Sequence, residues 1–378
     1  MQCSHYDASR CRSCTQLPQP YDQQLAAKQQ HCADIFARYS ELQWLPPVRS
    51  PEFGFRNKAK MVVSGSWRRP VLGILDAAGQ GVDLSDCGLY SPGLQSCFAA
   101  LSEFISLAVI SPYNVALKRG ELKYLLITES DIGELMLRFV LRSEEPLERI
   151  RRHLPELMQA LPQLKVVSVN LQPEHKAILE GPTEILLTPD APQLTIQINE
   201  LPLHLRPQSF FQTNTEIAAA LYRQARDWVN ELEPESLWDL YCGVGGFALH
   251  CASPWRDVIG VETSTDAIAS AQQSAAELGL KRVQFKTLDA SAFALGSDVE
   301  APQLVIVNPP RRGLGAGLSG YLNQSRVRWV IYSSCNAESL ARDLAAMPAF
   351  KPHQARLLDM FPHTQHFEVI VLLSRSEN

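Results

Sequence analysis

Two short motifs in the second half of the chain contain residues that suit covalent chemistry beside a cofactor. Ser334-Cys335-Asn336 places a lone cysteine directly after the predicted strand 329–333. Asp239-Leu240-Tyr241-Cys242-Gly243-Val244-Gly245-Gly246-Phe247 has the form of a glycine-rich loop between a strand and a helix. Because the thiolate of cysteine is a strong nucleophile, the two motifs together predict a thiol nucleophile beside a bound cofactor.

The glycine-rich loop follows the predicted strand 237–241. Its glycines, among them Gly243 and Gly245, allow positive φ and let the backbone approach a ligand closely. Glu262 ends the next predicted strand about 20 residues later, where a carboxylate can accept hydrogen bonds from both hydroxyls of a ribose. The loop lacks the third glycine of dinucleotide-binding loops and resembles the loop of class I S-adenosylmethionine methyltransferases.

A third motif, Asn308-Pro309-Pro310-Arg311, follows the predicted strand 304–308. Methyltransferases that act on exocyclic amines carry a similar Asn/Asp-Pro-Pro sequence, followed by an aromatic residue that stacks on the flipped base. The fourth residue here is Arg311, which argues against methylation of an amino group. The alternative is a turn with no further role.

A thiol beside a methyl donor suits methylation of carbon 5 of a pyrimidine, an atom too weakly nucleophilic to take a methyl group unaided. Addition of the Cys335 thiolate to carbon 6 gives an enolate with electron density on carbon 5. After methylation a base must remove the carbon 5 proton so that the thiol can leave. Glu368, which follows His363 and His366 in an apolar segment, is the predicted base. A metal site at the two histidines is the weaker interpretation, since no third ligand is evident.

The chain contains nine cysteines. Cys3, Cys11 and Cys14 stand close together at the N-terminus, and Cys87 supplies a possible fourth ligand. Four thiolates suit either zinc or an iron–sulfur cluster, and the spacing does not decide between them. The remaining cysteines, apart from Cys335, are expected to be packing residues or bystanders: Cys32, Cys97, Cys242 and Cys251.

The predicted elements that must position these residues divide the chain into three zones and give an α/β fold class. Residues 1–49 form a Cys-rich segment with a helix at 23–39. Residues 50–205 combine strands with one amphipathic helix at 146–161, which predicts an α+β central domain. Residues 206–378 alternate strands and helices, which predicts a class I Rossmann-like domain with its ligands at the carboxyl ends of parallel strands. The strands expected in the central zone are 59–64, 124–128, 135–141, 166–171, 185–187 and 194–198.

Composition narrows the cellular setting. With 46% hydrophobic and 20% charged residues the chain is ordinary for a soluble globular protein. No run of about 18 apolar residues is present, so we expect no membrane span. The N-terminus lacks a secretory signal, which predicts a cytoplasmic protein with reduced cysteines. A net charge of −5 argues against a wholly basic surface but leaves room for basic patches, the best placed around Lys58 and Arg119.

Taken together, these residues resemble the RNA uracil-5-methyltransferase family. The motifs that carry the resemblance are specific as a set and cover most of the chain from 206 onward: Gln208-Ser209-Phe210-Phe211-Gln212-Thr213-Asn214, 239–247, 308–313, 333–336 and 363–368. The resemblance implies that four residues contact S-adenosylmethionine, namely Gln212, Tyr241, Glu262 and Asn308. It also implies that Cys335 is the nucleophile and Glu368 the general base. Several relatives carry Asp at position 308; if that Asp handles protons, Asn308 retains only a positioning role.

The resemblance extends to the N-terminal part of the chain. For Cys3, Cys11, Cys14 and Cys87 it implies a [4Fe-4S] cluster with a structural role. The length, the cysteine-bearing start and the segment 55–61 are most similar to the branch that methylates one specific uridine of 23S ribosomal RNA. That RNA is then the expected partner of a protein that we expect to be a monomer, without membrane contact. The alternatives are the same chemistry on transfer RNA, a non-catalytic RNA-binding factor with a vestigial cofactor fold, and, least favoured, a redox protein.

Overall fold

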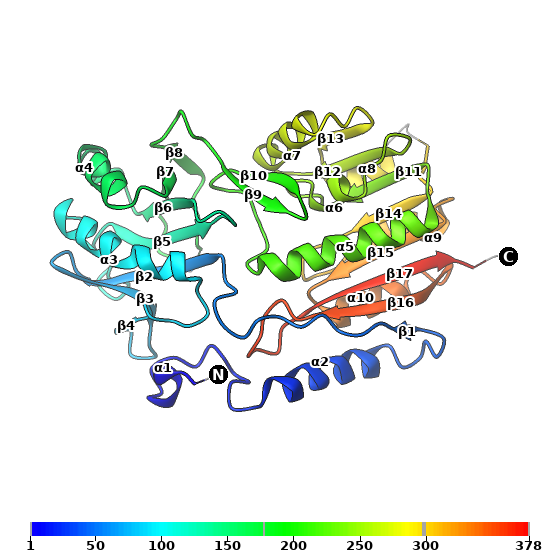
Figure 1. Cartoon of the computed structure of the whole chain (residues 1–378), viewed down its shortest axis with the longest axis horizontal. Helices are drawn as coiled ribbons and strands as arrows, with labels where there is room; N and C mark the ends of the chain where they lie inside the picture. The colour runs from blue at the N-terminus through cyan, green and yellow to red at the C-terminus, as the bar shows by residue number, and fades with distance from the viewer. Residues whose placement is uncertain (1, 177, 297–299, 377–378) are drawn as a thin grey trace. The chain divides into compact units, whose positions relative to one another are not determined.

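A computed structural model describes residues 2–176, 178–296 and 300–376 (Figure 1). The chain divides into two compact units. The first comprises Met1–Cys14 and Glu52–Ile196, and the second comprises Thr15–Pro51 and Gln197–Asn378. The N-terminal segment is therefore shared, and most of it belongs to the unit that holds the glycine-rich loop and Cys335.

The first unit is built on a seven-stranded sheet with the order β4-β3-β2-β5-β6-β7-β8. Its strands are β2 (Lys58–Ser66), β3 (Arg69–Leu75), β4 (Gly81–Asp83), β5 (Leu122–Glu129), β6 (Leu135–Leu141), β7 (Leu164–Leu171) and β8 (Thr183–Leu186). Neighbouring strands are antiparallel except β6 and β7, which are parallel and joined through α4 (Leu147–Ala160). The short helix α1 (Ser4–Asp7) belongs to the same unit.

The helix α3 (Pro92–Leu107) is an element of the first unit that the sequence prediction missed. Its start carries a clear signal, because Ser91 caps the helix by accepting the Leu94 N–H at 3.3 Å and Pro92 takes the first helical position. Its buried residues follow helical spacing: Leu94, Cys97, Phe98, Leu101, Phe104 and Ile105. Together with α4, this face covers one side of the sheet and forms the main core of the unit.

The second unit contains an eight-stranded sheet with the order β1-β16-β17-β15-β14-β11-β12-β13. Its strands are β1 (Gln43–Trp44), β11 (Ser236–Leu240), β12 (Asp257–Glu262), β13 (Val283–Thr287), β14 (Leu304–Val307), β15 (Trp329–Ser334), β16 (Phe350–Leu358) and β17 (Glu368–Arg375). The pairs from β15 to β13 are parallel, whereas β17 is antiparallel to both of its neighbours. A separate two-stranded sheet pairs β9 (Leu194–Ile198) with β10 (Leu201–Leu205).

Helices cover both faces of the eight-stranded sheet, as the alternating pattern predicted (Figure 1). They are α2 (Tyr21–Ile35), α5 (Thr215–Leu232), α6 (Gly246–His250), α7 (Thr265–Glu277), α8 (Ala290–Gly296), α9 (Gly315–Gln324) and α10 (Ala337–Ala345). Residues of α2, α8, α9 and α10 share one buried cluster with the sheet, in which Phe36, Trp238 and Tyr332 are among the largest side chains. The α/β class with a parallel sheet core is therefore confirmed. Within the described ranges no helix has the length and apolar character of a membrane span.

The direction of β17 determines which residues meet at the ligand-binding edge of this sheet. The parallel strands β11, β12, β14 and β15 all end at one edge, and β17 begins there because it is antiparallel. The register pairs Ser334 with Val369, so Cys335 and Glu368 come next in register at this edge. The fold thus brings together two residues that lie 33 positions apart (368 − 335).

Candidate functional site

The turn between β15 and α10 positions Cys335. Before it, Ser334 Oγ accepts the Asn336 N–H at 3.0 Å. After it, Asn336 caps α10 by accepting the N–H groups of Glu338 and Ser339 at 3.1 and 3.3 Å, and its side-chain amide donates to the Arg311 carbonyl at 3.2 Å. The backbone on both sides of Cys335 is therefore held by side chains, which places the half-buried thiol at a defined point.

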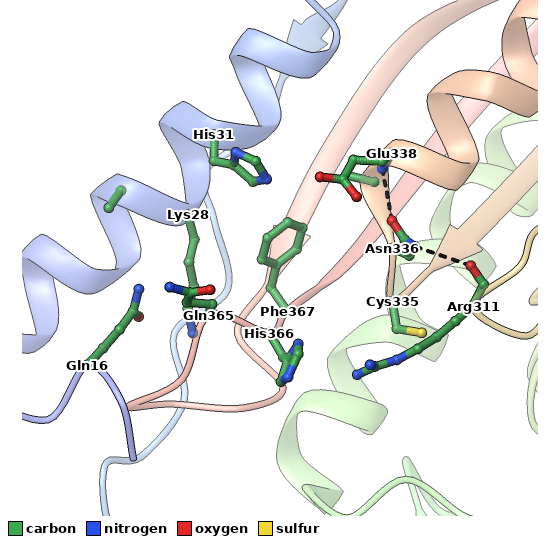
Figure 2. Close-up of a pocket in the computed structure, with 12 residues that line it drawn as sticks. Gln16, Lys28, His31, Arg311, Cys335, Asn336, Glu338, Gln365, His366 and Phe367 are labelled. Carbon is green, nitrogen blue, oxygen red and sulfur yellow. Dashed lines mark hydrogen bonds between the residues drawn. The ribbon is translucent and has the colours of Figure 1, made fainter. Parts of the chain in front are cut away.

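The Cys335 thiol opens into a cavity of about 520 Å³. Figure 2 shows the Arg311 side chain running beside the Cys335 sulfur, and both residues line the cavity. Burial raises the pKa of Cys335, and the nearby Glu368 carboxylate raises it further, whereas Arg311 lowers it. The Arg311 side chain therefore favours the thiolate.

Glu368, the first residue of β17, lies 2% exposed and accepts a hydrogen bond from Ser333 Oγ at 2.8 Å. Burial raises the pKa of this carboxyl group to about 7, against a smaller lowering by the Ser333 hydroxyl. A carboxyl group that titrates near neutral pH can both accept and release a proton there. The structure therefore brings the predicted nucleophile and the predicted base to the same edge.

The glycine-rich loop lies at this edge and is tied to Glu262. Glu262 Oε2 accepts the Gly243 N–H at 3.3 Å, while Oε1 accepts the N–H groups of Thr263 and Ser264 at 2.7 and 3.1 Å. Gly243 and Gly245 both have positive φ, +53° and +87°. A Cβ on Gly245 would approach Phe285 Cζ at 2.9 Å, so this position excludes any larger residue.

Two more predicted residues, Tyr241 and Asn308, stand beside the loop. Tyr241 adopts φ +68°, which is strained for a residue with a side chain, and its N–H donates to the Val261 carbonyl at 3.0 Å. The Asn308 N–H donates to the Leu240 carbonyl at 3.4 Å, directly after β14. Both residues therefore lie at the carboxyl edge, where open α/β sheets bind ligands.

Gln212 is buried in the segment that leads into α5. Two residues later Asn214 caps α5, and its side-chain amide donates to Ser50 Oγ at 2.8 Å and to the Met360 carbonyl at 3.4 Å. Met360 follows the end of β16, a strand that runs in the same direction as β15. The Gln212 segment is thereby attached to the same edge of the sheet.

The helix α2 forms one wall of the Cys335 cavity, which the sequence analysis did not predict. Figure 2 shows Lys28 and His31 of α2 facing the cavity from the side opposite Cys335. Lys28 Nζ forms a buried ion pair with Asp359 at 2.6 Å and also donates to the Phe361 carbonyl at 3.1 Å. The spacing of Lys28 and His31 on one helix face is too common to have identified them.

The two histidines before Glu368 have separate surroundings. His363 is buried with φ +64°, and its N–H donates to Gln24 Oε1 at 2.9 Å. His366 is exposed and lines the cavity, and burial together with Arg311 lowers its pKa. These contacts give His363 a role in positioning the segment that leads to Glu368.

The four cysteines of the predicted cluster all belong to the first unit and influence one another. Burial, with added repulsion from Cys87, Cys11 and Cys3, raises the pKa of Cys14 to about 11, while Arg56 opposes the rise. Thiols that interact in this way fit a metal or iron–sulfur centre, which binds thiolates and removes their repulsion. In the described residues no group of three or more His, Cys, Asp or Glu side chains has the geometry of a formed metal site. The other predicted packing cysteines are buried: Cys32, Cys97, Cys242 and Cys251.

The two basic segments expected to contact RNA differ in exposure. Lys58 is half-buried, and its pKa is lowered by burial and by Arg138. Lys60 and Arg119 are exposed. Exposed cations are free to meet phosphates, so Lys60 and Arg119 suit an RNA contact better than Lys58.

Comparisons with known proteins agree with this geometry. Residues 182–376 match a model of the family described as tRNA (Uracil-5-)-methyltransferase. The 23S rRNA (uracil(747)-C(5))-methyltransferase RlmC of Shigella boydii serotype 4 is 54% identical over 374 residues, which cover 99% of each chain. The RlmC of Pectobacterium atrosepticum is 53% identical over 377 residues, covering 100% of each chain.

A solved structure is similar over nearly the whole chain. The Pyrococcus abyssi tRNA (uracil-54, C5)-methyltransferase, in complex with S-adenosyl-L-homocysteine, superimposes with a TM-score of 0.78 at 25% identity, covering 95% of this chain and 85% of the other. The fold and the site therefore define a Rossmann-like methyltransferase. Within that class, the chain belongs to the RNA uracil-5-methyltransferase family.

Proposed function

We propose that this protein transfers a methyl group from S-adenosylmethionine to carbon 5 of uridine 747 of 23S ribosomal RNA. One observation supports this proposal above all. The Cys335 thiol, the buried Glu368 carboxyl group and the glycine-rich loop lie at the same edge of the sheet. The choice of RNA and of nucleotide rests on the 54% identity to the RlmC of Shigella boydii, whose name specifies uracil 747.

We assign to the cofactor the residues that lie around the glycine-rich loop at the carboxyl edge of the sheet. Glu262 binds the ribose hydroxyls, Gly243 and Gly245 let the backbone approach, and Gln212, Tyr241 and Asn308 complete the contacts. When bound, S-adenosylmethionine supplies an electrophilic methyl group. Asn308 has no acidic proton, so its role is to position.

Cys335 begins the reaction. Its thiolate, favoured by Arg311, adds to carbon 6 of the uracil, and the electron pair of the 5,6 double bond moves toward carbon 5 and the carbonyl oxygen at carbon 4. Carbon 5 uses this electron pair to form its bond to the methyl group, while the bond between that methyl group and the sulfonium sulfur of the donor would break and leave S-adenosylhomocysteine. The target uridine must leave its stack for Sγ to reach carbon 6.

Glu368 ends the reaction by accepting the proton of carbon 5. The electron pair of that C–H bond restores the 5,6 double bond, and the bond between carbon 6 and Sγ breaks to release the thiolate. The carboxyl group must be ionised to accept this proton, and its pKa of about 7 makes that possible near neutral pH. Ser333 holds Oε1 in place through its hydroxyl.

The experiment that tests this function uses a 23S RNA fragment in which 5-fluorouridine replaces the target uridine. Fluorine cannot leave as a proton does, so the protein and S-adenosylmethionine should give a denaturation-resistant protein–RNA band. The band should be absent with Cys335→Ala and present with Cys97→Ala, the control for a cysteine of the first unit that lies outside the site. Absence of the band with bound cofactor and RNA would refute the assigned nucleophile or substrate, and a band with transfer RNA alone would replace the substrate.

We also propose that Cys3, Cys11, Cys14 and Cys87 hold a [4Fe-4S] cluster. The mutual influence of their thiols supports four ligands around one centre. Methyl transfer moves no net electron, so the cluster stabilises the first unit and takes no part in the chemistry. Anaerobic absorbance spectra and metal analysis test the assignment: iron near four atoms per chain is expected, and stoichiometric zinc without iron would refute it.

A further inference from the structure

A hollow of about 210 Å³ in the first unit contains side chains that the proposed chemistry does not use. It lies at the start of β5, between the loop that precedes β5 and the segment that follows β7. Its polar and aromatic lining consists of Tyr113, Lys123, Tyr124, Glu174, His175 and Lys176, with aliphatic side chains of β2 and β3 beside them. This volume is below the range of about 300–1,000 Å³ that is usual for sites of larger ligands, and it suits a single ring system.

Two tyrosine rings line the hollow, and their positions are held by neighbours. The Tyr113 hydroxyl hydrogen-bonds to His175 Nδ1 at 2.8 Å. Lys123 Nζ lies 4.8 Å from the centre of the Tyr113 ring, and Lys60 Nζ lies 5.4 Å from the centre of the Tyr124 ring. Fixed aromatic rings beside cations are the combination on which unpaired nucleobases stack.

The charges around the rings favour an anion. The Lys123 ammonium group is buried, and it donates to the Gln172 side-chain oxygen and, at 2.7 Å, to the Glu174 backbone carbonyl, both of which are neutral. The Glu174 carboxylate pairs instead with Lys176 Nζ at 2.5 Å, and Glu121 pairs with Arg142. The Glu121 and Glu174 carboxylates favour the charge of Lys123 and Arg142 opposes it. Because each carboxylate already has a cation of its own, a nearby phosphate would still stabilise the buried ammonium group.

The loop before β5 gives the hollow a basic and apolar rim. Val115 lines the hollow and is 50% exposed, and Leu117 is 68% exposed. Lys118 and Arg119 follow directly and are exposed. Backbone hydrogen bonds between Asn114 and Arg119, at 2.7 and 3.3 Å, hold this loop closed, so the rim is a formed surface.

We propose that this hollow binds one unpaired nucleotide of the RNA substrate, away from the reacting uridine. Its base stacks on Tyr113 and Tyr124, and its phosphate lies against Lys60 and Lys123. The proposal rests on the proposed function for the identity of RNA as substrate and adds a second recognition site on the first unit. An acidic peptide would use the lysines but not the paired rings, so the aromatic lining favours a nucleotide.

Photocrosslinking of the wild-type protein tests the contact directly. A 23S RNA fragment that carries 4-thiouridine at unpaired positions is irradiated with the holoprotein, and the crosslinked peptides are identified by mass spectrometry. We expect a nucleotide attached to Tyr113 or Tyr124. Crosslinks confined to residues of the second unit would overturn the proposal.

Substitution of Tyr113 tests how much the stacked base contributes to the free energy of RNA binding. Loss of one stacked base is worth about 1–3 kcal/mol, so Tyr113→Ala should raise the Kd for the RNA fragment about tenfold and KM equally. Tyr113→Phe keeps the ring and should change Kd less than about twofold. Ile132→Ala, at an exposed residue in the turn that follows β5, is the control and should bind as the wild type does. Each variant must show unchanged thermal unfolding and unchanged binding of S-adenosylhomocysteine.

The outcomes separate this proposal from the proposed function. Lys123→Gln should also reduce the slope of log Kd against log salt concentration by about the contribution of one phosphate contact. If the wild type methylates the fragment and Tyr113→Ala has wild-type Kd and KM, only the nucleotide site is refuted. If Lys123→Gln alone weakens binding, the stacked base is refuted. If the wild type methylates no 23S RNA, the proposed function itself fails.

Discussion

The substitution Glu368→Gln isolates the last step of the proposed reaction. The amide is nearly the same size as the carboxyl group and retains an oxygen for the Ser333 hydroxyl bond, but it cannot accept the carbon 5 proton. We therefore expect methyl transfer to proceed and release to stop. Ordinary uridine RNA should then give the denaturation-resistant adduct that the wild type gives only with 5-fluorouridine RNA.

The pKa of Glu368 determines how strongly the rate of product release depends on pH. A pKa of about 7 leaves roughly one carboxyl group in ten ionised at pH 6 and nine in ten at pH 8. The rate of product release by the wild type should thus fall about tenfold from pH 8 to pH 6. The Gln variant should release slowly at both values, because it has no group that titrates there.

Stability gives an independent measure of the same pKa. The folded pKa lies above the ordinary value of 4.5, so the folded state binds more protons between pH 4.5 and 7, and the wild type loses stability as pH rises through that range. At about 1.4 kcal/mol per pKa unit, ionised Glu368 costs the folded state about 3 kcal/mol at pH 8. Relative to the wild type, Glu368→Gln should therefore be stabilised about 2 kcal/mol more at pH 8 than at pH 5.

The assays are denaturing gels for the adduct and denaturant unfolding at pH 5 and pH 8 for stability. Glu41→Gln, at an exposed carboxyl group of the second unit, serves as the control for a change of charge. Equal stability differences at the two pH values would show that Glu368 does not titrate with a raised pKa. Normal turnover by Glu368→Gln would show that another group removes the proton.

Three further predictions concern groups around the site. Arg311→Ala should shift the acidic limb of kcat/KM to higher pH and lower kcat/KM about tenfold at pH 7, because the guanidinium favours the thiolate; a profile with an unchanged limb would refute this. Gly245→Ala should abolish cofactor binding, as measured by calorimetry. Gly279→Ala, also at positive φ but in open space, should retain cofactor binding and lower the free energy of unfolding by about 1 kcal/mol. Equal cofactor binding by the two variants would contradict the steric argument. Lys28→Met should lower the free energy of unfolding by about 3–5 kcal/mol, and Asp359→Leu added to it should restore much of that loss; no restoration would mean that the buried pair is not the cause.

Local sequence was sufficient for most features of the parallel sheet. The strands that end at Leu240, Glu262 and Val307 lie within a residue of their predicted positions, and Cys335 follows its strand as expected. A strand followed by a polar turn and a helix is a local pattern, and parallel strands collect their ends at one edge. The α/β class could thus be inferred from local patterns, whereas the family was inferred from the resemblance of its motifs.

Other parts of the fold depended on contacts between distant segments. The helix α3 was missed despite a local cap and helical spacing, so its signal was present in the sequence and was overlooked. The helix α2 was expected, but nothing in its sequence indicated that it packs on the eight-stranded sheet and lines the cavity of Cys335. Such packing depends on the shape of a surface built from residues some 200 to 350 positions later in the chain.

The sequence by itself determined which functional groups are present: a thiol, a carboxylate, a glycine-rich loop and four further cysteines. Only the tertiary structure decided that Glu368 stands beside Cys335, because this depends on the antiparallel insertion of β17 next to β15 and on its register. A shift of that register by one residue would turn the carboxyl group to the other face of the sheet. The burial that raises its pKa to about 7 is likewise a property of the packed sheet and not of the residue.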